Sequence, residues 1–134
     1  MPMPEKIILS YIESLLRNSI RILKDRAYQQ RVWFRAEGPE CSTYIDVTIH
    51  FIDGCESIFK MPVCAAYLGE ENYALLQKLY QLTIEHVDLT ESRINPDLLE
   101  EDVLMNDPKW HEIQALAAEI YPKLTEFVKR QNYE

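Results

Sequence analysis

The chain of 134 residues contains little glycine: only Gly38, Gly54 and Gly69. A phosphate-binding loop needs several glycines within a few residues, so the sequence offers no candidate for one. It also has no HExxH pair, no paired-cysteine motif and no EF-hand spacing, which are the common patterns of metal sites. These gaps make an enzyme the weaker expectation and a binding protein the stronger one.

Cysteine is scarce as well, with three residues, an odd number. Cys41 and Cys55 are expected to flank one extended strand, which would place them roughly 45 Å apart, too far for a disulfide. Free thiols in a reducing cytosol are therefore expected. The longest apolar runs, such as residues 7–9, are far too short to span a bilayer, and residues 1–5 do not resemble the basic start of a signal peptide. We expect a cytoplasmic protein that does not bind membranes.

Positive charge is lacking in the second half of the chain. Residues 1–69 carry eight Lys/Arg and eight Asp/Glu, whereas residues 70–134 carry six and fourteen, which accounts for the whole net charge of −8. An acidic protein repels nucleic acid and anionic lipid, so neither is an expected partner. A basic protein is the natural complement.

Helical periodicity marks both ends of the chain. Residues 5–27 predict an amphipathic helix whose apolar face is formed by Ile8, Ile12, Leu15, Leu16, Ile20 and Leu23. Further helices are predicted over residues 70–87, from Asn95-Pro96 through Leu104, and from Asp107-Pro108 onward. The last carries a core-facing stripe and should kink or restart near Tyr121, because Pro122 follows.

Between these helices the apolar residues alternate. Residues 31–37 and 42–52 alternate apolar and polar positions, Asp53-Gly54 is a hairpin signal, and residues 55–60 would return as a third strand. The sequence therefore predicts a single α+β domain over residues 1–134. Its antiparallel meander of three strands, possibly four, would be flanked by an N-terminal helix and C-terminal helices.

Acidic residues concentrate between residues 85 and 112, where nine acids meet only two basic residues. Such a local field would steer a basic partner. One alternative is an ordinary solvated face with helix caps; another is internal compensation by Arg17, Arg21 and Lys24. The predicted partner-binding acids are Asp88, Glu91, Asp97, Glu100, Glu101, Asp102, Asp107 and Glu112.

The outward face of the predicted sheet supplies a second candidate surface. Trp33, Arg35, Tyr44, Asp46 and His50 would share this face, and Trp, Tyr and Arg are enriched at binding hot spots. The alternative is that another segment covers the face and makes it a second small core.

A metal site is the remaining candidate. His86, Asp88 and Glu91 lie close in sequence, and His111 with Glu112 flanks the acidic stretch. Carboxylates and two histidines could hold a divalent ion, but we interpret them instead as surface polar residues near helix ends. We predict no catalytic residue, metal or cofactor, and keep a small metal-dependent enzyme as an alternative.

The segment "RVWFRAEGPECSTYIDVTIHFIDG", followed by "YALLQKLYQL", resembles in layout the YezG-like immunity proteins that neutralise bacterial toxins. The likeness covers roughly residues 10–85 and includes no diagnostic motif. It implies an inhibitor that acts by surface complementarity to a basic toxin, such as a nuclease. We therefore expect an immunity protein or antitoxin, with a secretion-effector chaperone as the alternative within binding functions. The sequence leaves the oligomeric state open.

Overall fold

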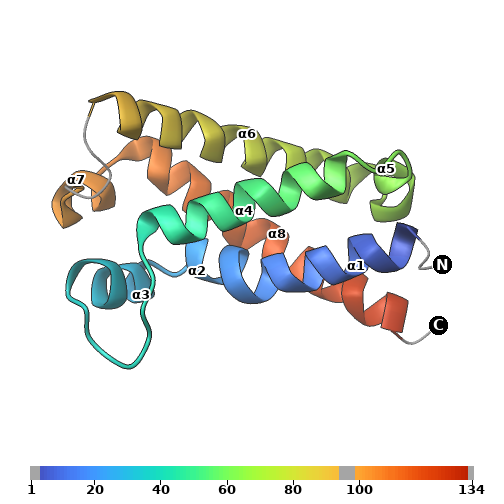
Figure 1. Cartoon of the computed structure of the whole chain (residues 1–134), viewed down its shortest axis with the longest axis horizontal. Helices are drawn as coiled ribbons and strands as arrows, with labels where there is room; N and C mark the ends of the chain where they lie inside the picture. Colours follow the sequence, from blue (N-terminus) through green and yellow to red (C-terminus); the bar gives the residue numbers. More distant parts are fainter. Residues whose placement is uncertain (1–3, 94–98, 133–134) are drawn as a thin grey trace.

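The computed structural model describes residues 4–93 and 99–132, and every regular element within these ranges is helical (Figure 1). The predicted α+β fold with its antiparallel meander is therefore wrong. In chain order, with η marking π-helical turns, the elements are α1 (Pro4–Leu15), η1 (Leu16–Ile20), α2 (Arg21–Leu23), α3 (Arg26–Tyr28), η2 (Gln29–Phe34), α4 (Tyr44–Phe59), α5 (Cys64–Leu68), α6 (Glu70–Arg93), α7 (Glu101–Met105) and α8 (Pro108–Asn132).

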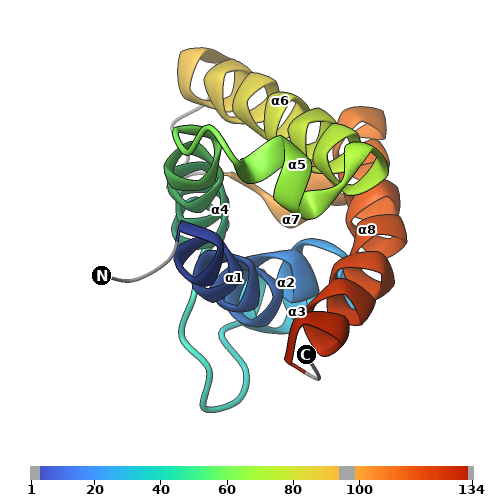
Figure 2. The same ribbon diagram turned by 90° about the vertical axis from the view of Figure 1, so that its right-hand side faces the viewer.

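Four long helical stretches run along the longest axis and surround one core (Figures 1 and 2). The stretch from α1 through α2 packs against α4, and α4 packs against α6. Helix α6 packs against α8, and α8 packs against η1 and α2, so the four stretches form a closed ring around the core. Helix α5 lies near the start of α1, whereas α3 and α7 lie at the opposite end (Figure 1). We call this opposite end, formed by residues 26–35, 44–46, 86–93 and 99–112, the distal end.

The helices predicted from 3.6-residue periodicity are confirmed, although the first ends at Leu23 and not at residue 27. All six apolar residues named for the first helix are buried, because they form the face that α1, η1 and α2 turn toward the core. The second long helix begins at Glu70 as predicted but extends to Arg93. The last begins at Pro108 and continues to Asn132 with Pro122 inside it, so it does not restart near Tyr121. The predicted start at Asn95-Pro96 lies outside the described residues.

Helix α4 replaces the second and third predicted strands. Thr43 caps it: its hydroxyl accepts a hydrogen bond from the Asp46 N–H at 3.2 Å, and the Asp46 carboxylate accepts one from the Thr43 N–H at 3.1 Å. This reciprocal arrangement is a capping box. The residues that α4 buries recur at helical spacing rather than alternating: Tyr44, Val47, Thr48, Phe51, Ile52, Cys55 and Ile58.

Gly54, expected in a hairpin turn, lies inside α4 where this helix approaches α1. A Cβ atom at this position would stand 2.5 Å from Leu15 Cδ2, so a larger residue would collide with the fully buried Leu15 side chain. The glycine therefore permits close helix packing instead of a chain reversal.

The first predicted strand, over residues 31–37, is η2 and the turn after it. The following loop is held by a bidentate pair in which Arg31 donates to both Glu40 oxygens at 2.9 and 2.8 Å. Gly38 has φ of 91°, a conformation that glycine adopts without steric cost, and Arg31 Nη1 lies 2.4 Å from where its Cβ would be.

All three cysteines are free thiols, as expected, although not because a strand separates them. Cys41 is exposed, whereas Cys55 and Cys64 are buried, and burial raises the pKa of both buried thiols. Among the helices described, none combines the length and apolar character required to cross a membrane.

Candidate functional site

Three polar side chains from three helices meet at the distal end. Tyr44 begins α4, His86 lies in the second half of α6, and Asp107 directly precedes α8. The Tyr44 hydroxyl lies 2.7 Å from His86 Nδ1, and His86 Nε2 lies 2.9 Å from Asp107 Oδ2. The His86 side chain is 4% exposed and that of Asp107 is 32% exposed, so the row leads from the core to the surface.

The surrounding hydrogen bonds favour one tautomer of a neutral His86. Thr90 donates its hydroxyl hydrogen to the His86 carbonyl at 2.8 Å, which leaves Thr90 Oγ1 as an acceptor 3.4 Å from the Tyr44 hydroxyl. A carboxylate can only accept, so in a neutral ring the hydrogen lies on Nε2 and is donated to Asp107, and Nδ1 is the acceptor for the Tyr44 hydroxyl. Burial lowers the pKa of His86, opposed by the hydrogen bond to Asp107, and burial raises the pKa of Tyr44.

An aromatic cluster fixes the His86 ring in place. The ring centroid of His86 lies 5.6 Å from that of Tyr44 and 5.0 Å from that of Trp110, and Trp33 packs on Trp110 at 5.9 Å. Trp110 is fully buried, and its indole N–H donates to Gln29 Oε1 at 2.9 Å. The Gln29 amide in turn donates to two carbonyls of α2. These bonds hold the cluster rigid, since each buried polar group has a partner.

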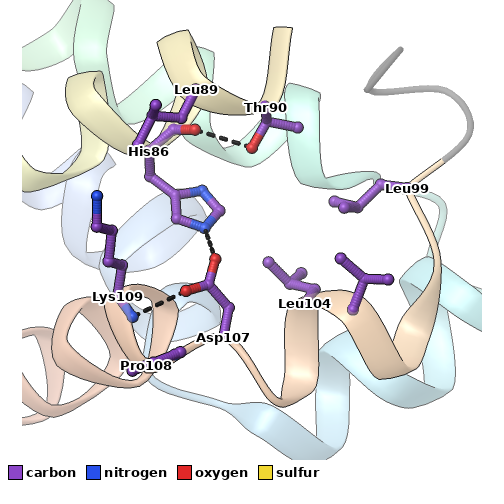
Figure 3. A pocket seen from close by; sticks show the side chains of 9 residues that line it. His86, Leu89, Thr90, Leu99, Leu104, Asp107, Pro108 and Lys109 are labelled. Atoms are coloured by element: carbon purple, nitrogen blue, oxygen red, sulfur yellow. Dashed lines mark hydrogen bonds and ion pairs between the residues drawn. The ribbon is translucent and has the colours of Figure 1, made fainter. Parts of the chain in front are cut away.

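A cavity of 370 Å³ opens beside this row (Figure 3). Its apolar lining comes from α6, α7 and the residues that flank α7: Leu89, Leu99, Val103, Leu104 and Pro108. Its polar lining is supplied by His86, Thr90, Asp107 and Lys109. The Asp107 carboxylate is held from two sides, because Oδ1 accepts from the Lys109 N–H at 2.9 Å while Oδ2 faces His86. The site therefore combines an apolar wall with one oriented carboxylate.

Most of the predicted partner-binding acids gather around this cavity's end of the molecule. Five are exposed, on the last turns of α6, on and before α7, and on the first turns of α8: Asp88, Glu91, Glu100, Asp102 and Glu112. Glu101 instead pairs with Arg35, whose guanidinium donates to both carboxylate oxygens at 3.2 Å. Asp107 belongs to the row described above, where it is partly exposed. Asp97 lies outside the described residues.

The sheet face predicted to carry these residues is wrong, because Trp33, Tyr44 and Asp46 are helical and Arg35 lies in the turn after η2. Tyr44 is 4% exposed, and Trp33 is half-buried with its indole N–H donating to Ser42 Oγ at 3.2 Å. Asp46 is exposed but serves the capping box of α4, and Arg35 pairs with Glu101. The alternative expectation, that these aromatic residues form part of a core, describes their burial better.

The other alternative was that Arg17, Arg21 and Lys24 of the first helix compensate the charge of the acidic segment. The contacts of Arg21 and Lys24 are with other groups. Arg21 donates to the Arg17 carbonyl at 3.1 Å, and the Lys24 ammonium lies 4.9 Å from the centroid of the Tyr121 ring. Arg35, through Glu101, and Arg26, which donates to the Met105 carbonyl at 2.8 Å, contact the acidic segment instead. Both come from the short elements of the distal end.

The metal candidates do not converge. Within residues 4–93 and 99–132, no group of three or more His, Cys, Asp or Glu side chains is placed to hold an ion. His86 uses both ring nitrogens in the row described above, and His111 contacts the Met105 carbonyl from the exposed side of α8. Asp88, Glu91 and Glu112 are exposed.

A second polar cluster, which sequence reasoning did not identify, lies between α1, η1 and α4. His50 contacts Ser19 Oγ through Nδ1 and lies 3.4 Å from Ser14 Oγ through Nε2. Ser19 is fully buried, and a cavity of 200 Å³ adjoins Ser14 and His50. The contacts satisfy a histidine at a helix crossing, where the small serine side chains leave room for its ring.

Comparisons of this chain with protein-family models, with curated proteins and with solved structures found no match.

Proposed function

We propose that the protein is a binding module that neutralises a basic protein, acting as an immunity protein or antitoxin through its distal end. Its action requires surface complementarity and no chemistry. The free thiols are compatible with action in the cytoplasm.

The arrangement of the five exposed acids carries this proposal. They come from three segments that are separate in sequence, yet the fold brings all three to one end of the bundle (Figure 1). Like charges brought together repel one another and reduce the stability of the compact state. The same arrangement gives a concentrated negative potential that accelerates association with a basic partner and disfavours other partners.

The cavity beside Asp107 adds a second feature that suits protein recognition. Interfaces usually combine a polar rim with an apolar pocket that receives one anchor residue of the partner. Here the exposed acids would form the rim, and Leu89, Leu99 and Leu104 line the pocket. The buried hydrogen bonds behind this pocket keep its wall ordered before a partner arrives, which reduces the entropic cost of binding.

The test is capture of the partner from a lysate of the source organism at stepped salt concentrations. The protein is immobilised as wild type and as the variant Glu100→Lys/Asp102→Lys. Glu101 is left unchanged because its ion pair with Arg35 links α7 to the end of η2. We expect the wild type to retain a basic protein at low salt and the variant to lose it.

The matched control is Asp53→Lys/Glu119→Lys, which changes the net charge equally but places both substitutions outside the distal end, at exposed positions of α4 and α8. We expect it to retain the partner almost as well as wild type. Equal loss in both variants would indicate nonspecific charge attraction, and retention by both would contradict a role for the distal acids.

A further inference from the structure

We propose that the cavity beside Asp107 receives an arginine side chain of the partner, with its aliphatic stem against the leucines and its guanidinium on the carboxylate. This inference rests on the proposed function, and it names the residue that the site would select.

The apolar wall suits the stem of arginine. Leu89, Leu99 and Leu104 line the cavity, and its volume of 370 Å³ lies within the range of pockets that enclose small organic groups. Long basic side chains bury their methylene groups along apolar surface while their charged heads reach polar groups. Val103 also lines the cavity and is 46% exposed, which places it at the mouth.

The carboxylate suits the head group. Each oxygen of Asp107 already accepts one hydrogen bond, Oδ1 from the Lys109 N–H and Oδ2 from His86, and each retains capacity for another. The carboxylate is thus oriented before any ligand arrives. Its burial is incomplete, with 32% of the side chain exposed. A guanidinium presents two parallel N–H groups that match both oxygens of a carboxylate, whereas an ammonium cannot form this fork.

The charge of His86 matters for this pairing. A neutral His86 donates a hydrogen bond to Asp107 but does not neutralise it, so the carboxylate keeps its charge for the incoming cation. The burial that lowers the pKa of His86 favours this state. Glu100 and Asp102 are exposed nearby on the α7 segment and strengthen the attraction.

Lys109 acts in the opposite direction. It lines the cavity, and its positive charge, which also acts on His86, repels a cation bound beside Asp107. Asp107 and Lys109 thus have opposing effects on a bound cation, although they are only two residues apart. This opposition provides a matched pair of variants.

The experiment is a titration of the whole chain with n-propylguanidinium, which is the arginine side chain without its backbone, followed by amide NMR spectra. The comparison ligands are guanidinium, which lacks the stem, n-propylammonium, which lacks the fork, and butanoate, which carries the opposite charge. We expect saturable shifts at Thr90, Val103, Leu104 and Lys109, with n-propylguanidinium binding the tightest of the four. Equal shifts from butanoate or from guanidinium alone would overturn the proposal.

The variants test the contacts. Asp107→Asn keeps a good N-cap for α8 but removes the charge, so the Kd for n-propylguanidinium should rise about tenfold or more. Lys109→Gln should lower the Kd by about two- to fivefold. A Kd that is unchanged in Asp107→Asn, in a variant whose spectrum remains that of the folded protein, would overturn the assignment. So would weaker binding by Lys109→Gln.

The two proposals fail in different ways. If the distal acids capture a basic protein but n-propylguanidinium does not bind in the cavity, the arginine pocket is wrong and the proposed function stands. If n-propylguanidinium binds and Asp107→Asn captures the partner as well as wild type, the cavity holds a free cation rather than a partner residue, and the inference is overturned. If no basic protein is captured at all, the proposed function is wrong, and the assignment of a partner arginine to the cavity is wrong with it.

Discussion

Removal of the Tyr44 hydroxyl tests the hydrogen-bonded row most sharply. Tyr44→Phe keeps the ring that packs against Trp110 and deletes only the donor to His86 Nδ1, which lies 2.7 Å away. The nitrogen then stays buried without a partner, because the next hydroxyl, on Thr90, is already donated to the His86 carbonyl. Leaving a buried acceptor unpaired costs about 1–3 kcal/mol, so we expect the free energy of unfolding to fall by about 2 kcal/mol.

The assay is urea unfolding followed by circular dichroism at helical wavelengths. For a chain of 134 residues, the expected loss corresponds to a melting temperature lower by about 6–10 °C. Tyr11→Phe is the matched control, since Tyr11 is 38% exposed and its substitution should change the free energy of unfolding by less than about 0.5 kcal/mol. A loss in Tyr44→Phe no larger than that of the control would refute the buried contact with His86.

Further predictions concern pH, the helix cap and core packing. Folding lowers the pKa of His86 from its ordinary value of 6.5, so the unfolded chain binds the proton more readily. The stability that neutral His86 contributes is therefore present above about pH 6.5 and is lost as the pH falls below that value. His86→Gln can form both hydrogen bonds but does not titrate; its free energy of unfolding should therefore fall less than that of wild type between about pH 7.5 and 5.5, and parallel curves would contradict this. Thr43→Ala should cost about 1 kcal/mol through loss of the capping box of α4, whereas Thr43→Ser should cost much less, as measured by thermal unfolding. Gly54→Val should lower the free energy of unfolding by at least about 1 kcal/mol, because its side chain would collide with Leu15, and Leu15→Ala in the same chain should cost less than it does alone.

Sequence periodicity predicted the helices at both ends of the chain but failed in the middle. The last helix was located by Asp107-Pro108 and by a stripe of buried residues, both of which are local signals. Residues 43–52 contain β-branched residues in apparent alternation, yet they also contain the capping box formed by Thr43 and Asp46. That spacing was visible in the sequence and favoured a helix. Gly54 was ambiguous, since the same glycine serves a hairpin or a close helix contact, and only the position of Leu15 distinguishes them.

The acidic part of the site could be predicted from composition, whereas the row behind it could not. Asp107 was identifiable as a helix cap, and His86 as a polar residue in a helix. Their pairing depends on how α6 packs against α8, and the position of Tyr44 depends on α4 being a helix. One signal was present: Thr83, His86 and Thr90 continue the buried face of α6 beyond Leu79, so polar residues occupy core positions and require partners there.

The most direct test of the account is zero-length carbodiimide cross-linking of the wild-type protein in a lysate of its source organism, followed by mass spectrometry of the joined peptides. The reagent couples carboxylates to lysine amines with which they are in contact, so it reports which acids face the partner. The account predicts that the cross-links to a basic protein arise from Glu91, Glu100, Asp102 and Glu112 on the distal end. Cross-links from Glu13, Asp53 or Glu56 in place of these would contradict it, and would move the binding surface to α1 and α4.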